Sequence, residues 1–307
     1  MTTITAPGVY YDVPSMDYHN DPCRVPSLSA SMCKIILTST LAHAREAHPR
    51  LNPNFVREEG ERKFDLGSAC HALLLEGGKG IRIINPAHYP AKNGNIPKGW
   101  TNPSIQAARD DAYAAGMVPV LPDQFAQVEA MAISVKDQVK DHEEMVGWLN
   151  DGCSEVTLIW RDLGGIWCRA RVDWMPSDPR RIWCDLKTTG TTANPASLGR
   201  FAADQGWDIQ DAFYRRGIKA LGLAPSFEPQ FRFGCVETYP PYCFSVVGIP
   251  PEEATIADRR VDVAMRRWEL AMRSGEWPGY PKKTCWIDFP PWARASALEA
   301  ITGSDNS

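Results

Sequence analysis

The segment Arg171-Val-Asp-Trp-Met175, followed by Asp185-Leu-Lys187, decides the fold. Both stretches are rich in β-branched, aromatic and apolar residues, and this composition predicts adjacent β-strands. Successive side chains of a strand point to opposite faces, so Asp185 and Lys187 share one face. The sequence therefore predicts a hairpin that brings the carboxylates of Asp173 and Asp185 close to a lysine.

Working outward, the centre of the chain predicts an antiparallel three-stranded meander. Its strands are expected over Glu155–Trp160, Ile166–Trp174 and Arg181–Lys187. The segments 162–165 and 176–179 separate them, and both are dense in Gly, Pro, Asp or Ser, the residues typical of turns.

Helices and further strands are expected on both sides of the meander. Apolar spacing predicts helices over 27–37, 63–76, 122–148, 208–221 and 252–273, strands over 230–237 and 243–248, and a loop over 90–104. Phe64, Gly67, His71 and Leu74 or Leu75 share one face of the second helix. This order predicts a mixed α/β (α+β) fold, with a central mixed sheet flanked by helices and an N-terminal helical extension.

The expected domain organisation is one domain over residues 26–295. It divides into a helical part (26–150) and a part with the sheet and its helices (151–295). An irregular arm (1–25) precedes the domain, and a flexible tail (296–307) follows it.

The composition is that of a globular protein of 307 residues, with 44% hydrophobic and 23% charged residues. A formal net charge of −4 argues against coating nucleic acid by bulk charge, so DNA binding would need a local basic surface. No apolar run approaches the roughly 20 residues that span a bilayer, and residues 1–16 do not resemble a secretory signal. The nine cysteines form no C-x-x-C pair. We therefore expect reduced thiols, a cytoplasmic location and no membrane partner.

Two acids beside a lysine suit metal-assisted cleavage of a phosphodiester. The acids would hold a divalent cation, and Lys187 would position or deprotonate the attacking water. Simpler explanations exist for each residue alone. Asp173 could be a turn-forming acid at a strand end, and Asp185 with Lys187 could form an ordinary salt bridge. Asp185 is the harder residue to explain away, because an acid between Cys184 and Leu186 is disfavoured inside a strand.

For four other residues, a structural role and a functional role are both possible. His71 could be a core histidine or an imidazole that completes a metal site. Gln210 and Tyr214 share a helix face, where such residues most often pack or lie at the surface. Glu155 could be a strand-edge acid that discourages aggregation.

The order of these residues along the chain resembles a known family. The series is Gly67-x-x-x-His71, Glu155, Asp173, Asp185-x-Lys187 and Gln210-x-x-x-Tyr214. It resembles the RecB/RecE-type branch of the PD-(D/E)XK nuclease superfamily, and more narrowly the nuclease domain of exodeoxyribonuclease VIII and its phage relatives. The resemblance covers about residues 15–290. One departure is Asp185, where the superfamily usually has Glu.

The resemblance implies a role for each residue. His71, Asp173 and Asp185 would ligate Mg²⁺ or Mn²⁺, together with the backbone carbonyl of Leu186. Lys187 would serve the nucleophilic water. Gln210 and Tyr214 would support the site or contact the DNA backbone, and Glu155 would be an additional acid. Some relatives carry an iron–sulfur cluster, but Cys235, Cys243 and Cys285 are spaced too widely for that pattern, so no cluster is expected.

Basic residues near the Gln210 helix are candidates for DNA contacts. They are Arg200, Arg215, Arg216 and Lys219, with a further group on the late helix at Arg259, Arg260, Arg266, Arg267 and Arg273. The alternative is that these are solvated helix faces.

The resemblance implies a metal-dependent exodeoxyribonuclease that degrades linear double-stranded DNA, from 5′ ends, and leaves 3′ single-stranded tails for phage or prophage recombination. Double-stranded DNA ends would be its partner. Family members often act beside a single-strand annealing protein and form homo-oligomeric rings, in the bacterial host cytoplasm when phage-encoded. The alternatives are a nuclease specific for single strands or flaps, and a catalytically silent DNA-binding recombination scaffold.

Overall fold

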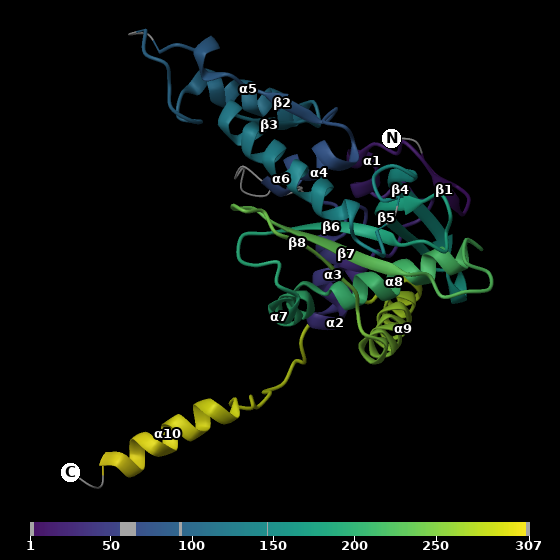
Figure 1. Cartoon of the computed structure of the whole chain (residues 1–307). Coiled ribbons are helices and arrows are strands. Elements are labelled where there is room, and N and C mark those ends of the chain that lie inside the picture. Colours follow the sequence, from purple (N-terminus) through teal and green to yellow (C-terminus); the bar gives the residue numbers. More distant parts are fainter. Residues whose placement is uncertain (1–2, 56–65, 92–93, 146, 305–307) are drawn as a thin grey trace.

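The computed structural model describes residues 3–55, 66–91, 94–145 and 147–304 (Figure 1). A mixed sheet of six strands lies at its centre in the order β1-β4-β5-β6-β7-β8. The strands are β1 (Gly8–Tyr10), β4 (Gly152–Arg161), β5 (Trp167–Pro176), β6 (Trp183–Thr189), β7 (Phe231–Glu237) and β8 (Phe244–Val247). Neighbouring strands are antiparallel except β6 and β7, which are parallel. The predicted α/β fold class is confirmed.

The predicted meander is formed by β4, β5 and β6. Val156 is the register partner of Val172, and Trp174 is the partner of Cys184. Val172 is fully buried in the core, whereas Asp173 points to the opposite face of the sheet, as strand alternation requires.

Helices cover both faces of this sheet. The helices of the described ranges are α1 (Ser15–His19), α2 (Ala30–Thr38), α3 (Leu41–Ala47), α4 (Leu66–Leu75), α5 (Pro103–Ala114), α6 (Pro122–Lys140), α7 (Pro195–Gln205), α8 (Trp207–Ala220), α9 (Pro251–Ser274) and α10 (Pro291–Ser304), and not all of them contact the sheet. Figure 1 shows α4 and α6 on one side, with α2, α3, α8 and α9 on the other. None of the helices in the described ranges is long and apolar enough to cross a membrane.

Each helical layer buries its own apolar core against the sheet. Trp160 of β4, Phe213 of α8 and Trp268 of α9 belong to one core, in which the rings of Trp160 and Phe213 are 4.9 Å apart. Met131 of α6 and Leu186 of β6 belong to the other core. The strand that carries Asp185 and Lys187 is therefore held from both sides.

Several segments differ from their prediction. The arm is not wholly irregular, because β1 pairs with β4 and α1 follows it. The long helix expected to residue 148 ends at Lys140, and turns follow. Helices α5 and α7, and a small parallel sheet of β2 (Ile81–Ile83) and β3 (Val118–Val120), were not predicted.

Two further segments, the start of the helix expected over 63–76 and the tail expected over 296–307, also differ from the prediction or fall partly outside the described residues. Residues 63–65 of the helix expected over 63–76, including Phe64, lie outside the described residues, and α4 begins at Leu66. Residues 296–304, expected as flexible tail, belong to α10, which projects away from the rest of the chain (Figure 1).

Candidate active site

One large cavity of about 1540 Å³ is lined by residues of the N-terminal half and of the meander strands. Elements from across the chain line it, including α4, β4, β5, β6 and α8. The predicted site residues among its lining residues are His71, Glu155, Asp173, Asp185, Leu186, Lys187, Gln210 and Tyr214. The structure therefore brings together in one cavity residues that are up to 143 positions apart (214 − 71).

Asp173 joins the two strands of the hairpin where their ladder opens. Its Oδ2 accepts a hydrogen bond from the backbone N–H of Leu186 at 2.7 Å. The carboxylate therefore takes the place of a strand carbonyl, and this fixes Asp173 beside the segment that carries Asp185. A bond of this kind also favours the ionised carboxylate.

Lys187, Asp185 and Gln210 form a closed triangle of polar contacts. Lys187 Nζ lies 2.6 Å from Asp185 Oδ2 and donates to Gln210 Oε1 at 3.0 Å. Gln210 Nε2 in turn donates to Asp185 Oδ1 at 2.5 Å. Strand alternation places Asp185 and Lys187 on one face, and α8 supplies the glutamine that orients both side chains.

Tyr214 lies one turn after Gln210 on the same face of α8. It is buried, and its ring packs edge-on against Phe231 at 5.3 Å. Burial raises the pKa of Tyr214 well above its usual value, so the phenol stays neutral. Its position supports packing of α8 against the sheet at the cavity wall.

His71 of α4 contacts acids of two neighbouring strands, β4 and β5. Its Nε2 lies 3.1 Å from Glu155 Oε1 and 3.1 Å from Asp173 Oδ2. Burial alone would lower the pKa of His71, but the charges of Asp173 and Glu155 and a hydrogen bond to Asp173 raise it to about 9. The imidazole therefore acts as a cation between two carboxylates when no metal neutralises them.

Glu155 has an unusual backbone conformation for a strand residue. Its φ is 56°, in the left-handed region, and it lies between the register pairs Ser154↔Trp174 and Val156↔Val172. A non-glycine residue held this way costs roughly 1–3 kcal/mol, and such residues cluster at functional sites. Arg171 Nε donates to Glu155 Oε2, which leaves Oε1 directed toward His71.

The pKa values of the three acids do not all shift in the same direction. Burial and the neighbouring Asp173 raise the pKa of Asp185 to about 6, despite the opposing effect of Lys187. Burial would also raise the pKa of Asp173, but His71, Lys187 and the Leu186 N–H lower it. Burial raises the pKa of Glu155. Ionising all three acids in one cavity is therefore costly unless a cation balances them.

The donor atoms of the site fit a divalent cation. Glu155 Oε1 and Asp185 Oδ2 are buried and accept no hydrogen bond from the described part of the chain, although His71 and Lys187 lie close to them. Carboxylate oxygens are the preferred ligands of Mg²⁺ and Mn²⁺, and imidazole completes such sites.

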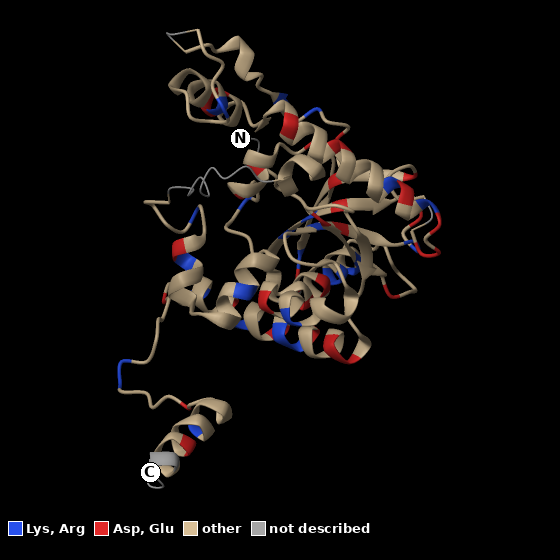
Figure 2. Ribbon diagram, turned by 60° about the vertical axis from the view of Figure 1, so that its left-hand side comes forward, with Lys and Arg blue, Asp and Glu red and all other residues tan. Residues whose placement is uncertain are grey.

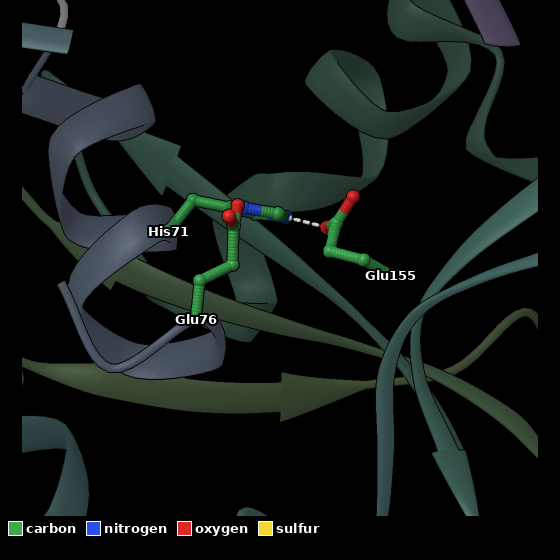
Figure 3. Close-up of side chains that lie close together, drawn as sticks. All are labelled: His71, Glu76 and Glu155. Atoms are coloured by element: carbon green, nitrogen blue, oxygen red, sulfur yellow. Dashed lines mark ion pairs between the residues drawn. The ribbon is translucent and has the colours of Figure 1, made fainter. Parts of the chain in front are cut away.

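A further acid, Glu76, was not predicted by the sequence analysis. Donor atoms of His71, Glu76 and Glu155 all lie within 4.8 Å of one another, and Figure 3 shows the three side chains directed toward a common point. The sequence carried no local signal for Glu76, because residues five positions apart do not lie on one face of a helix.

The basic residues near Gln210 that were expected to contact DNA do not line the cavity. Arg215 is buried, and its guanidinium pairs with Asp211, Glu228 and Asp258. Figure 2 shows acidic and basic positions interspersed along the helices of this layer. We therefore revise its expected role from a DNA contact to packing of α8 against α9.

The other three members of that group are also ion-paired. Arg216 binds Asp162 and Asp262, and Lys219 pairs with Glu228. Arg200 is exposed and lies 3.8 Å from Asp204 on α7. The sequence analysis identified these basic residues but not the acids that pair with them, several of which come from other segments of the chain.

A mixed sheet that presents Asp173 and Asp185-x-Lys187 to one cavity defines a PD-(D/E)XK-like nuclease fold. The chain belongs to the family described as PDDEXK-like domain of unknown function (DUF3799), whose model matches residues 29–286. This confirms the predicted superfamily and supports a nuclease, whereas the narrower RecB/RecE-type branch stays a prediction.

A solved structure agrees with this fold. The crystal structure of a "putative exonuclease" from Eubacterium rectale superposes with a TM-score of 0.53 at 14% identity, covering 94% of this chain and 95% of that chain. Among curated proteins, no sequence matches this chain. At this identity the similarity supports the fold alone.

Proposed function

We propose that the protein is a metal-dependent exodeoxyribonuclease that degrades linear double-stranded DNA, with 5′ to 3′ polarity. The observation that carries the proposal is the convergence of His71, Asp173, Asp185 and Lys187 in one open cavity. Each of these four side chains lies within 3.1 Å of another member of the set: His71 with Asp173, and Asp185 with Lys187. The exonuclease polarity rests on the family resemblance of the motifs.

The side chains have complementary tasks in this proposal. Asp173, Asp185 and the carbonyl of Leu186 would hold Mg²⁺, with His71 beside them. A bound divalent cation would offset negative charge on the phosphodiester and make a nearby water easier to deprotonate. Lys187 would orient that water, because Asp185 and Gln210 already fix its ammonium at 2.6 and 3.0 Å.

The biological setting is proposed on the same resemblance. The 3′ single-stranded tails left by the reaction would serve phage or prophage recombination in the host cytoplasm, with a single-strand annealing protein as partner and a homo-oligomeric ring as the working form. The intact lysine and acids favour this enzyme over a silent scaffold, because a scaffold does not need the costly burial of Asp185.

Digestion of end-labelled linear duplex with Mg²⁺ tests the proposal. We expect the 5′ label to be released first, with circular duplex left intact. We expect Asp185→Asn to lose roughly several-hundred-fold or more of the activity, because a metal ligand is removed. Asp178→Asn is the matched control, since Asp178 lies in the turn between β5 and β6, outside the cavity. Equal activity of Asp185→Asn and wild type would contradict the site, and cleavage of flaps in preference to duplex ends would favour the alternative nuclease.

A further inference from the structure

Phe201 of α7 is an aromatic residue that lines the cavity and is not covered by the rest of the protein. Its exposed fraction is 39%. Among the large apolar side chains that are exposed in the described ranges, Phe201 is the only one that lines the cavity. Phe201 therefore offers an open apolar ring to any molecule that enters the cavity.

The ring of Phe201 is supported from within the protein by two other rings. Its centroid lies 5.8 Å from that of Trp207, and the two rings are nearly perpendicular, at 87°. Trp207 is buried and stacks on Phe233 of β7, with 4.9 Å between the centroids. Phe201 is thus the outer member of a row of three aromatic residues anchored in the sheet. A ring that is already held in place loses little conformational freedom when a ligand binds to it.

The inner part of this aromatic row lies beside the lysine of the proposed site. Lys187 Nζ is 6.0 Å from the centroid of the Trp207 ring and 5.7 Å from that of the Phe233 ring. The ring of Phe201 is therefore no more than about 12 Å from Lys187 Nζ, and stacked nucleotides rise about 3.4 Å each. A base that stacks on Phe201 would lie within about four nucleotides of the bond that Lys187 serves.

A cation lies beside the same wall of the cavity. The side chain of Lys34 of α2 crosses the junction between α7 and α8, where its Cδ lies 3.0 Å from the place that a β-carbon of Gly206 would take. The neighbours of Gly206, Gln205 and Trp207, both line the cavity. Lys34 forms no ion pair with an acid in the part of the chain that the structure describes. Its ammonium is therefore available to a phosphate.

We infer that Phe201 is a stacking platform for an unpaired base of the DNA strand that enters the cavity, with Lys34 at an adjoining phosphate. This inference rests on the proposed function, because it takes DNA as the substrate. Aromatic side chains stack on bases of any sequence. A base inside an intact duplex has both faces covered by its neighbours and cannot stack in this way. Phe201 therefore favours strands that are unpaired close to the bond to be cut, without sequence preference.

Binding of DNA that lacks single bases tests the inference. The probe is a fluorescein-labelled duplex with several mismatched pairs at one end, and an abasic nucleotide replaces each unpaired nucleotide of both strands in turn. Fluorescence anisotropy measures Kd, with CaCl₂ in place of MgCl₂ to prevent cutting. We expect at least one abasic position to weaken binding by the wild type roughly 5- to 150-fold, the usual effect of losing one stacked base.

The variants of Phe201 separate stacking from packing. Phe201→Ala should bind the unmodified probe more weakly by a similar factor and should be insensitive to the same abasic position, because ring and base belong to one contact. Phe201→Leu keeps an apolar side chain against Trp207, so it preserves the fold, and it should bind as Phe201→Ala does. Phe201→Trp should bind as the wild type does. The matched control is Phe289→Ala, which removes an exposed ring outside the cavity and should leave Kd unchanged.

Three results would overturn the inference. They are a wild type that binds every abasic probe as tightly as the unmodified one, a Phe201→Leu variant with wild-type affinity, and a Phe201→Leu variant that keeps the wild-type sensitivity to the abasic position. Digestion of linear duplex with Mg²⁺ separates the two proposals. Nuclease activity without any abasic effect retains the proposed function alone, and the abasic effect without nuclease activity retains base stacking on Phe201 alone.

Discussion

Gln210 accepts a hydrogen bond from Lys187, with 3.0 Å between Oε1 and Nζ. The other end of the same amide contacts Asp185, so one side chain of α8 holds both polar groups of β6. The carbonyl oxygen and the amino group of a glutamine are needed at once, because Lys187 can only donate and an ionised Asp185 can only accept. The role of Gln210 is therefore to position the lysine relative to the acid.

Gln210→Ala should lower kcat by about 10- to 100-fold, the usual range when an orienting partner of a site is removed. KM for linear duplex should change little, because this amide is already occupied by Lys187 and Asp185. Steady-state kinetics measures both constants. The control is Gln205→Ala, which removes a glutamine of α7 from the same cavity. A rise in KM with unchanged kcat would instead make Gln210 a DNA-binding residue.

The second prediction follows from the left-handed backbone conformation of Glu155. Because its φ of 56° suits glycine, Glu155→Gly should be more stable than Glu155→Ala by about 1 kcal/mol, even though glycine usually destabilises a strand. Urea denaturation in the presence of a chelator compares the free energies of unfolding of the two variants. Both lose the ion pair with Arg171, so that loss cancels in the comparison. Greater stability of the alanine variant would show that the left-handed conformation is not kept.

The lowered pKa of the buried Asp21 leads us to expect a loss of stability in acid. It is fully buried and contacts Ser27, His48 and Arg169. Burial alone would raise the pKa of Asp21, but these partners lower it to about 2, below its ordinary value of 3.8. As the pH falls, the carboxyl of Asp21 is therefore protonated in the unfolded chain before it is protonated in the folded protein. Its ionisation contributes about 2 kcal/mol to the free energy of unfolding; this contribution is complete above pH 4 and disappears as the pH falls toward 2.

The comparison with Asp21→Asn isolates this contribution from other acids. The difference in free energy of unfolding between wild type and variant should be constant from pH 7 to about pH 5 and should shrink below pH 4. Asparagine also tolerates the positive φ of position 21, which is 62°. A difference that stays constant down to pH 2 would contradict the ionised state of Asp21.

Gly217 sets the distance between α8 and β4. A β-carbon at this position would lie 2.7 Å from the ring of Trp160. Gly217→Ala should therefore destabilise the protein by about 1–3 kcal/mol through overpacking. Gly199→Ala in α7 is the matched control, because its β-carbon would meet nothing within 4 Å, and it should be neutral or stabilising by up to about 1 kcal/mol. Thermal or urea unfolding of both variants checks the contrast.

The sheet and much of the site could be predicted because their signals are local. Strand alternation alone places Asp185 and Lys187 on one face, and helical spacing places Gln210 and Tyr214 on one face of α8. Short elements carry weaker signals. The three residues of β1 show no period, and α7 contains Gly199 and a proline at its start, which are also typical of loops.

Residues whose role depends on a distant partner could not be predicted. The side chain of Arg215 is neutralised by Asp258, 43 positions later on α9, and no local pattern reveals that pairing. Glu76 was missed because an exposed acid after a helix is common, and only its distance to Glu155 of β4 distinguishes it. Packing between elements therefore decides which charges remain available to a ligand.

The wide separation of His71 and Gln210 along the chain has a consequence during synthesis. The ribosome releases the imidazole of α4 long before β6 and α8, so a nascent polypeptide contains part of the cavity lining and none of the lysine triangle. Translation products that stop before residue 210 should therefore lack the proposed nuclease activity, which needs more than two-thirds of the 307 residues.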